Sequence, residues 1–343
     1  DDGDSIRCDE SHRWSAYHAR DRHKKDRKPR VVTALEMFES QKYGDRTAWS
    51  LPIAEPVQYP AQELPVHPYV LGAWLGDGDS CRQRLTFHKD DRAIFDRCVE
   101  LCGDSGSHET PHKLKPYVIS GSIGGKDFKR RLKSLGVMGR SGSKFIPAAY
   151  LRGSVEQRLE LLKGLLDTDG TVAKGAGSYI EVSFSLERLA RNTLELVRSL
   201  GFKAHFSSSP SKLYGRVVGT RYRVYFTART PVFYLPRKLA EQELTGEVGG
   251  KANHRHVVKI VEMPSVPTKC ITVDSPDQTY LATRSYTVTH NSNQVAIGHL
   301  LWRIGKDPNA SFGIMCNSER MAAKILRSIK AYIMESLELR DVF

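Results

Sequence analysis

The distribution of apolar and polar residues changes character along the chain. Residues 1–66 form short strand-like runs that prolines interrupt. From Pro68 onward helical periodicity takes over, as in the amphipathic segment 187–200, whose apolar residues recur on one face. Beyond about residue 251 strand-like runs return, at 257–261 and 270–273. We therefore predict one β-rich domain that is interrupted by an inserted α+β domain.

The inserted part contains an internal repeat, and the end of the chain has a pattern of its own. Two segments of similar design follow each other at a spacing of about 90 residues, which suits a duplicated domain. After Ser292 a helix over 293–304, a strand over 312–316 and a long helix over 319–336 are expected. This order is typical of an αβα piece of a parallel sheet.

Composition narrows the classes of function. The 343 residues suffice for two or three domains. The excess of 52 Lys and Arg over 39 Asp and Glu gives a net charge of +13, which suits a polyanionic partner such as nucleic acid. No apolar run approaches the roughly 18 residues that span a bilayer, so we expect a soluble protein. The six cysteines form no CxxC pair, which indicates a reducing, cytoplasmic environment. The sequence begins without Met and without a signal peptide, so we expect the N-terminus of the protein to lie upstream.

Two short motifs place an acidic residue at the end of an apolar helix. The first, VLGAWLGDG, ends in Asp77 and Gly78, and the second, LKGLLDTDG, ends in Asp169 and Gly170. Small residues four positions apart lie on one face of each helix, so two such helices can pack closely with both aspartates at one end. Each stretch alone could be a buried helix with a solvated Asp at its tip. The duplication favours a functional pair.

Paired carboxylates are suited to Mg²⁺, and paired metal ions can activate water and stabilise the leaving oxygen in phosphodiester cleavage. We therefore predict Asp77 and Asp169 as catalytic residues and metal ligands, with Mg²⁺ as the cofactor.

The motif pair resembles the two-motif LAGLIDADG, or DOD-type, homing endonucleases, in which a monomer mimics a dimer. The resemblance covers about residues 68–250 and includes Lys144-Phe145-Ile146-Pro147, which looks like the Lys-x-Ile-Pro block of the family. It implies a monomeric enzyme, a role for Lys144 in the endonuclease block, and curved sheets over the major groove of double-stranded DNA. The DNA contacts that it implies are Arg82, Arg84, His88, Lys89, Arg221 and Arg223.

A second set of motifs flanks the inserted part. Residues 269–274 (KCITVD), 280–281 and 288–292 (VTHNS) together resemble the two C-terminal blocks of inteins. Residues 3–14 (GDSIRCDESHRW) resemble the block whose His activates the N-terminal scissile peptide. The resemblance implies a splicing domain of the Hint type in which His12 is that His. Asp9 stands where the family usually has Thr, so this chain departs from the family at the residue that would polarise the scissile peptide.

The residue types at the C-terminal block fit the chemistry of splicing. The side-chain amide of Asn291 can attack its own backbone carbonyl and cut the chain, while His290 donates a proton to the leaving amine. Ser292 supplies a hydroxyl that can accept an acyl chain before that cut.

Three residues resemble the signature of class 3 inteins: Trp14, Cys270, which replaces the usual Asp, and Thr289. In that class the internal Cys attacks the N-terminal scissile bond directly. Taken singly, Cys270 is more often a small buried residue and His12 a structural one.

The tail, residues 292–343, resembles the large terminase subunit of tailed phages just after its phosphate-binding loop. Ser292 would then complete a Gly-Lys-Ser sequence and help to hold Mg²⁺ beside ATP. Another P-loop ATPase is the alternative host. The tail contains no complete Walker A motif, so we expect no ATPase activity from it.

We thus predict a multidomain chain: an all-β Hint splicing domain (1–66 and 252–291), interrupted by an α+β duplicated endonuclease (67–251), then an α/β P-loop ATPase fragment (292–343). Protein splicing would be combined with site-specific double-strand cleavage of the intein-less host gene. Its partners would be that DNA and the host exteins, and no membrane is expected. The protein would be cytoplasmic, in a bacterial host or encoded by a phage. The alternatives are an intein whose nuclease has decayed to DNA binding, and a free-standing homing endonuclease.

Overall fold

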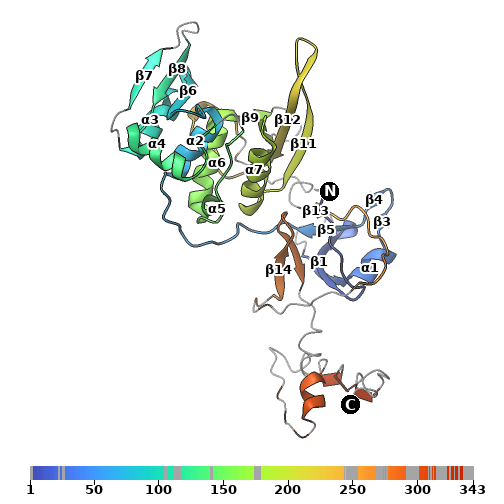
Figure 1. The fold of residues 1–343 in the computed structure, drawn as a ribbon. Helices are drawn as coiled ribbons and strands as arrows, with labels where there is room; N and C mark the ends of the chain where they lie inside the picture. Colours follow the sequence, from blue (N-terminus) through green and yellow to red (C-terminus); the bar gives the residue numbers. More distant parts are fainter. Residues whose placement is uncertain are drawn as a thin grey trace.

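The computed structural model describes residues 3–21, 24, 28–103, 107–111, 117–139, 142–173, 179–242, 244, 254–266, 273, 275, 277–290, 301–307, 309, 311, 313, 323, 326–327, 329–330 and 333–334. Figure 1 shows a β-rich part, a larger mixed α and β part, and the tail. Among the described residues no helix combines the length and the apolar character that crossing a membrane requires.

The β-rich part is built around one antiparallel sheet with strand order β13-β5-β1-β2. Its strands are β1 (Arg13–His18), β2 (Arg30–Thr33), β5 (Trp49–Pro52) and β13 (His254–His256). Alternate residues of β1 point inward, so Trp14 and Ala16 join Trp49 and Leu51 in a small apolar core. Since β13 pairs with β5, the segments before and after the insertion share this sheet.

Short elements complete this part. They are η1 (Ala19–Asp21), α1 (Ala34–Glu39), the hairpin of β3 (Lys42–Tyr43) and β4 (Arg46–Thr47), and the hairpin of β14 (Thr279–Ala282) and β15 (Thr287–His290). Thr33 and Glu36 form a capping box that begins α1. The β15 strand lies against β1.

The strand expected over 257–261 is wrong, because the strand ends at His256. Val257 and Ile260 both pack against the small core. Residues three apart on a strand point to opposite faces, so a regular strand could not bury both. The segment is instead fixed by Val257 N donating to Trp49 O (3.1 Å).

The inserted part consists of two halves of similar design, as the repeat predicts. The first half contains a sheet with strand order β6-β8-β7, and its elements are α2 (Pro68–Asp77), β6 (Arg84–His88), η2 (Lys89–Asp91), α3 (Arg92–Cys102), β7 (His108–Pro111), β8 (Val118–Ser122), α4 (Gly125–Ser134) and α5 (Ala148–Leu151). The second half contains a sheet with order β11-β12-β10-β9, and its elements are α6 (Val155–Asp169), β9 (Gly170–Ala173), β10 (Tyr179–Phe184), α7 (Glu187–Ser199), β11 (Ala204–Leu213), β12 (Arg216–Phe226) and α8 (Pro236–Glu241). The amphipathic helix predicted over 187–200 is α7.

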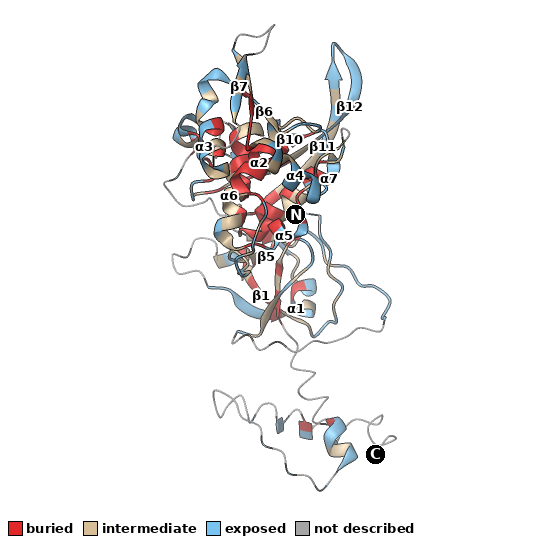
Figure 2. Ribbon diagram, turned by 60° about the vertical axis from the view of Figure 1, so that its left-hand side comes forward, coloured by how far each residue is buried: buried red, intermediate tan, exposed pale blue. Residues whose placement is uncertain are grey.

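Helices α2 and α6 pack face to face at the centre of the core of the inserted part, where Figure 2 shows buried residues concentrated. Glycine makes this approach possible, because a Cβ on Gly72 would lie 2.2 Å from Leu161 O. A Cβ on Gly164 would in turn lie 2.1 Å from Tyr69 O. The backbones of the two helices therefore touch, and the contact is nearly symmetric between the halves.

Ion pairs also join the halves. Arg237 of α8 forms a bidentate pair with Asp91, with N–O distances of 2.6 and 2.7 Å. Arg97 of α3 pairs with Glu160 of α6 at 2.7 Å and its guanidinium lies over the ring of Tyr234. These contacts support the register that the helix pair sets.

A strap, residues 54–66, runs from β5 to α2 along the inserted part (Figure 1). Val57 N donates to Ser199 O (2.9 Å), Gln62 N donates to Gln157 Oε1 (3.0 Å), and Val66 is buried in the core of the inserted part. In the tail, residues 301–306 are helical, so the end of the helix expected over 293–304 is observed. Apart from Gly313, the strand expected over 312–316 lies outside the described residues, and so does most of the helix expected over 319–336.

Candidate functional site

The two acidic helix ends meet where α2 and α6 converge. Both helices end at an aspartate, Asp77 and Asp169, and the following Gly donates its N–H back to a carbonyl of the last turn. A Cβ on Gly76 would lie 3.2 Å from Asp169 Oδ2. The carboxylate of one helix therefore lies against the last turn of the other. After each aspartate the chain enters a sheet, since Gly78 bridges to Leu85 and Gly170 pairs with Val182.

Both carboxyl groups are hard to ionise in this position. Burial, together with the charge of Asp77, raises the pKa of Asp169 to about 6 against the positive charges of Lys144 and Lys238. Burial also raises the pKa of Asp77. Two neighbouring carboxyl groups that repel each other in this way favour the binding of a cation.

Two buried lysines donate hydrogen bonds to backbone carbonyl groups at the C-terminal ends of the two helices. Lys144 Nζ donates to Gly76 O (3.0 Å) and Gly78 O (2.7 Å), at the end of α2. Lys238 Nζ donates to Leu166 O (2.9 Å) and Asp167 O (2.6 Å), at the end of α6. An ammonium at a helix C-terminus satisfies orphan carbonyls and opposes the negative end of the helix dipole. Burial lowers the pKa of Lys144 to about 8.

The counterpart of Lys144 was not found from the sequence. A signal exists, because Phe145-Ile146-Pro147 in the first half has the parallel Tyr234-Leu235-Pro236 in the second. The lysine precedes the triplet in the first half and follows it in the second, as Lys238, so no common motif connects them. The fold brings both to equivalent places.

Asp167, two positions before Asp169, has a different role. Asp167 accepts hydrogen bonds from Tyr69 Oη (2.7 Å) and from the backbone N–H groups of Tyr234 and Leu235. Both of its oxygens are therefore used to tie α6 to α2 and to the segment before α8. We assign it a structural role.

The pair Asp77 and Asp169 fits a divalent cation. Its oxygens are hard ligands, and burial and mutual repulsion favour a counter-charge. Within the described residues no group of three or more His, Cys, Asp or Glu side chains could hold a metal ion. The remaining ligands would have to be backbone oxygens, water or oxygens of a bound substrate.

The open faces of the two sheets carry polar and basic side chains. On β6 the buried Leu85 and Phe87 alternate with Arg84 and His88 on the opposite face. On β12 the buried Val224 alternates with side chains that include Arg221 and Arg223. The other two predicted DNA contacts, Arg82 and Lys89, are exposed and flank β6. The six predicted contacts are thus divided between the sheets of both halves.

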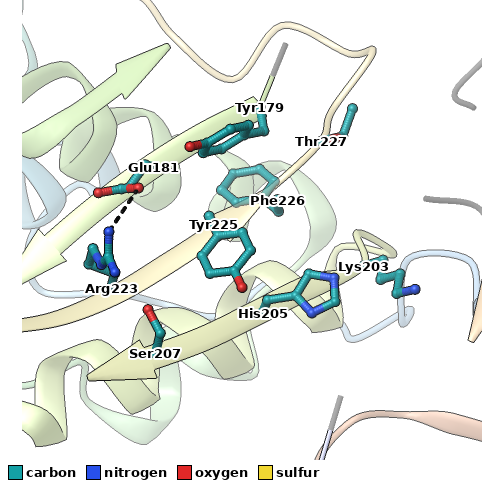
Figure 3. A pocket seen from close by; sticks show the side chains of 9 residues that line it. All are labelled: Tyr179, Glu181, Lys203, His205, Ser207, Arg223, Tyr225, Phe226 and Thr227. Atoms are coloured by element: carbon teal, nitrogen blue, oxygen red, sulfur yellow. Dashed lines mark ion pairs between the residues drawn. The ribbon is translucent and has the colours of Figure 1, made fainter. Parts of the chain in front are cut away.

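The sheet of the second half contains an open pocket of about 540 Å³. Figure 3 shows that Arg223 and Glu181 lie on neighbouring strands and face each other, with an Nη1–Oε2 distance of 3.9 Å. Beside them His205 stacks on Tyr225, with ring centroids 5.2 Å apart. The β11–β12 hairpin continues this face away from the body to an exposed tip at Tyr214 (Figure 1).

A second group of predicted residues meets in the β-rich part. His12 Nε2 and Thr289 Oγ1 form a hydrogen bond of 2.7 Å, and the rings of His12 and Trp14 lie edge to face with centroids 5.1 Å apart. His290, at the end of β15, is buried and adds a repulsion that, after burial itself, lowers the pKa of His12. Residues 277 positions apart in sequence are thereby brought into contact.

The other splicing residues, Cys270, Asn291 and Ser292, lie outside the described residues. Asp9, which stands at the position of the usual Thr, accepts hydrogen bonds from Ser11 N (2.8 Å) and Ser11 Oγ (2.5 Å). Its carboxylate therefore shapes the turn that leads to His12, whose backbone N–H donates to Asp9 O (3.1 Å).

Comparison with known proteins adds independent findings. Residues 145–234 match the family model described as homing endonuclease. The replicative DNA helicase DnaB of Mycobacterium intracellulare is 34% identical over 240 residues, which make up 70% of this chain and 37% of the helicase. The chain thus spans little more than a third of the length of that relative.

Among solved structures, this chain is similar to mesophilic variants of the homing endonuclease I-DmoI, with a TM-score of 0.35 and 11% identity over 51% of this chain and 95% of that one. It is also similar to I-DmoI in complex with DNA and Ca, with a TM-score of 0.34 and 12% identity over 51% and 95% of the two chains. The family-model match supports a homing endonuclease function for the inserted part of this chain.

Proposed function

We propose that the inserted part is a Mg²⁺-dependent LAGLIDADG endonuclease that cuts both strands of double-stranded DNA. The observation that carries this proposal is the pairing of two helix ends, each with one aspartate and one buried lysine. Two equivalent half-sites in a single chain match the two strands of a duplex, which are related by local two-fold symmetry. The enzyme would then act as a monomer.

The aspartates, the lysines and the sheet faces have separate roles in this proposal. Asp77 and Asp169 would hold the cation, which would supply water activation and stabilisation of the leaving oxygen. Lys144 and Lys238 fix the carboxyl ends of the helices and thereby orient the aspartates. The open sheet faces, with Arg84, Arg223 and their neighbours, contact the phosphates and base edges of the duplex.

Substitution of each aspartate tests this assignment. Asp77→Asn and Asp169→Asn should each abolish cutting but retain DNA binding, because the metal ligand is lost while the basic surface remains. Binding is measured by gel shift and cutting by plasmid linearisation. Full cutting by both single variants would remove these residues from catalysis.

We also propose that the β-rich part is a splicing domain of the Hint type that the endonuclease interrupts, so that residues 1–66 and 252–291 form one domain. The contact of His12 with Thr289, next to His290, supports this proposal. A neutral imidazole can both donate and accept a hydrogen bond at a scissile peptide, and the lowered pKa of His12 favours the neutral form at pH 7. In this proposal His290 protonates the amine that leaves when Asn291 cyclises.

The helicase relative supports insertion into a host protein. The alignment covers 240 residues, whereas the tail has only 52, so at least 188 aligned residues fall within 1–291. A replicative helicase therefore contains a segment similar to the proposed self-excising element. We retain a large terminase subunit as the proposed host for residues 292–343, with another P-loop ATPase as the alternative, and a cytoplasmic location.

The class 3 route is tested in an element that is completed with its upstream residues and host flank. Cys270 should be the first nucleophile, so Cys270→Ala should block N-terminal cleavage and branched-species formation. Asn291→Ala should allow the branched thioester to accumulate, and intact mass with added thiol detects it. Efficient N-terminal cleavage by the Cys270→Ala protein would exclude this route.

A further inference from the structure

A buried polar cluster joins the two proposed functional parts. Arg198, near the C-terminus of α7, is only 6% exposed although it carries a charge. Its Nη1 donates to Ser285 Oγ (2.5 Å), and its Nη2 donates to Ala204 O (3.2 Å) at the start of β11. One guanidinium thus connects the endonuclease sheet to the turn between β14 and β15.

The N-terminal segment contacts the same turn, and β13 contacts the first residue of β15, which directly follows the turn. Thr283 Oγ1 donates to Asp4 Oδ2, and Arg255 Nη1 donates to Thr287 Oγ1 (2.9 Å). Burial opposes ionisation of Asp4, but hydrogen bonds from Ser285 and Thr283 and the charge of Arg198 lower its pKa. An anionic, exposed Asp4 therefore lies near two buried arginines, Arg198 and Arg255, and offsets part of their positive charge.

The turn needs external support because its backbone is strained. Thr283 and Tyr286 have φ angles of 64° and 55°, in the left-handed region that residues other than Gly rarely adopt. Ser285, between them, is fully buried. Four residues after Ser285 stands Thr289, which contacts His12, and His290 follows. The strand that carries these residues begins at this turn.

We infer that Arg198 is a positioning residue for the splicing site: it belongs to the endonuclease part, yet it fixes the β14–β15 turn that places Thr289 and His290. The inference rests on the proposed splicing function. The inserted part would thus supply a residue that positions the splicing site of the domain that it interrupts.

The chain as it stands contains the bond between Asn291 and Ser292, so its cleavage can be followed by intact mass as release of residues 292–343. Arg198→Met keeps most of the length of the side chain but removes the hydrogen bonds and the charge. It should slow this cleavage about tenfold, within the range of coupling energies for contacting polar residues. Arg198→Lys restores the charge opposite Asp4 and should recover part of the rate. Arg191→Met is the matched control, because Arg191 lies on the same helix, is exposed, and forms its ion pair with Glu187 of that helix.

Two further measurements separate positioning from general loss of folding. DNA cleavage by Arg198→Met should stay at the wild-type level, whereas a folding defect would lower both activities. Ser285→Ala should slow the cleavage after Asn291 similarly, and the double variant should be no slower than the slower single variant. Hydrogen exchange across residues 279–290 should increase in both single variants.

Equal cleavage rates and equal exchange in Arg198→Met, Arg191→Met and the wild-type chain would overturn the inference. Additive effects of Arg198→Met and Ser285→Ala would also overturn it. Failure of the splicing proposal looks different: the wild-type chain, and the completed element, would then remain uncut after Asn291 while DNA cleavage is intact.

Discussion

Removing the charge of Asp169 should stabilise the metal-free protein while it abolishes DNA cleavage. The pKa of this carboxyl group rises from 3.8 to about 6 in the folded chain, mainly through burial and then through repulsion by Asp77. At 1.36 kcal/mol per pKa unit, ionised Asp169 costs about 3 kcal/mol at pH 7. The side-chain amide in the variant Asp169→Asn would carry no charge, so we expect a gain of up to about 3 kcal/mol, reduced by the cost of burying the amide.

The gain should depend on pH in a defined way. Between pH 3.8 and about 6 the folded chain binds the Asp169 proton and the unfolded chain does not. The stability of the metal-free wild-type protein therefore falls as pH rises through this window. Asp169→Asn lacks this fall, so its advantage should be small at pH 4 and full at pH 7. Mg²⁺ should stabilise the wild-type protein but not the variant.

Hydrogen exchange of peptides from α2 and α6 at pH 4 and pH 7 measures the effect locally, since the chain has more than one cooperative unit. Asp167→Asn is the matched control, because it removes a carboxylate from the same helix whose two oxygens accept hydrogen bonds. It should destabilise the helix pair by about 1–3 kcal/mol. A loss of protection in Asp169→Asn at pH 7, equal to that in Asp167→Asn, would refute the electrostatic reasoning.

Three other outcomes follow from the geometry. Lys144→Met and Lys238→Met should each lower DNA cleavage at least tenfold and increase hydrogen exchange at one helix end. A variant that cleaves at the wild-type rate would show that its lysine does not orient an aspartate. At limiting Mg²⁺ the rate of DNA cleavage should rise with pH as Asp169 ionises near pH 6, and fall as Lys144 loses its proton near pH 8. A rate that does not change between pH 5 and 9 would contradict both assignments. Replacing residues 67–251 by a short flexible linker should preserve splicing, because β5 and β13 pair in one sheet on either side of the insertion. The splicing rate should fall by about the factor seen for Arg198→Met. A folded short element that never splices would refute the proposed division of the chain.

The helix pair at the centre of the inserted part could be anticipated from sequence. Small residues at positions 72 and 164 stand at equivalent places in two copies of one motif, and this duplication favours a close contact between the two helices. The register of such a contact also fixes where the chain goes next. The position of both aspartates at one end therefore follows from local periodicity and symmetry.

Other features depend on contacts that no local pattern specifies. Lys238 reaches the end of α6 from outside the motif that marks Lys144, and Arg198 looks in sequence like one more basic residue of an amphipathic helix. Their roles come from burial, which is decided by how distant segments pack. The strand expected over 257–261 failed for the same reason, because packing of Val257 and Ile260 on the small core outweighed their β propensity.

We propose that this chain is a nuclease that recognises the site in the host gene at which its own coding sequence is inserted. The most direct test compares two plasmids in the presence of Mg²⁺, one with the uninterrupted host gene and one with the gene that contains the element. Insertion splits the recognition site, so the wild-type protein should linearise the first plasmid at the insertion point and leave the second intact. Equal cutting of both plasmids, or no cutting of the first by folded protein that binds DNA, would contradict this claim.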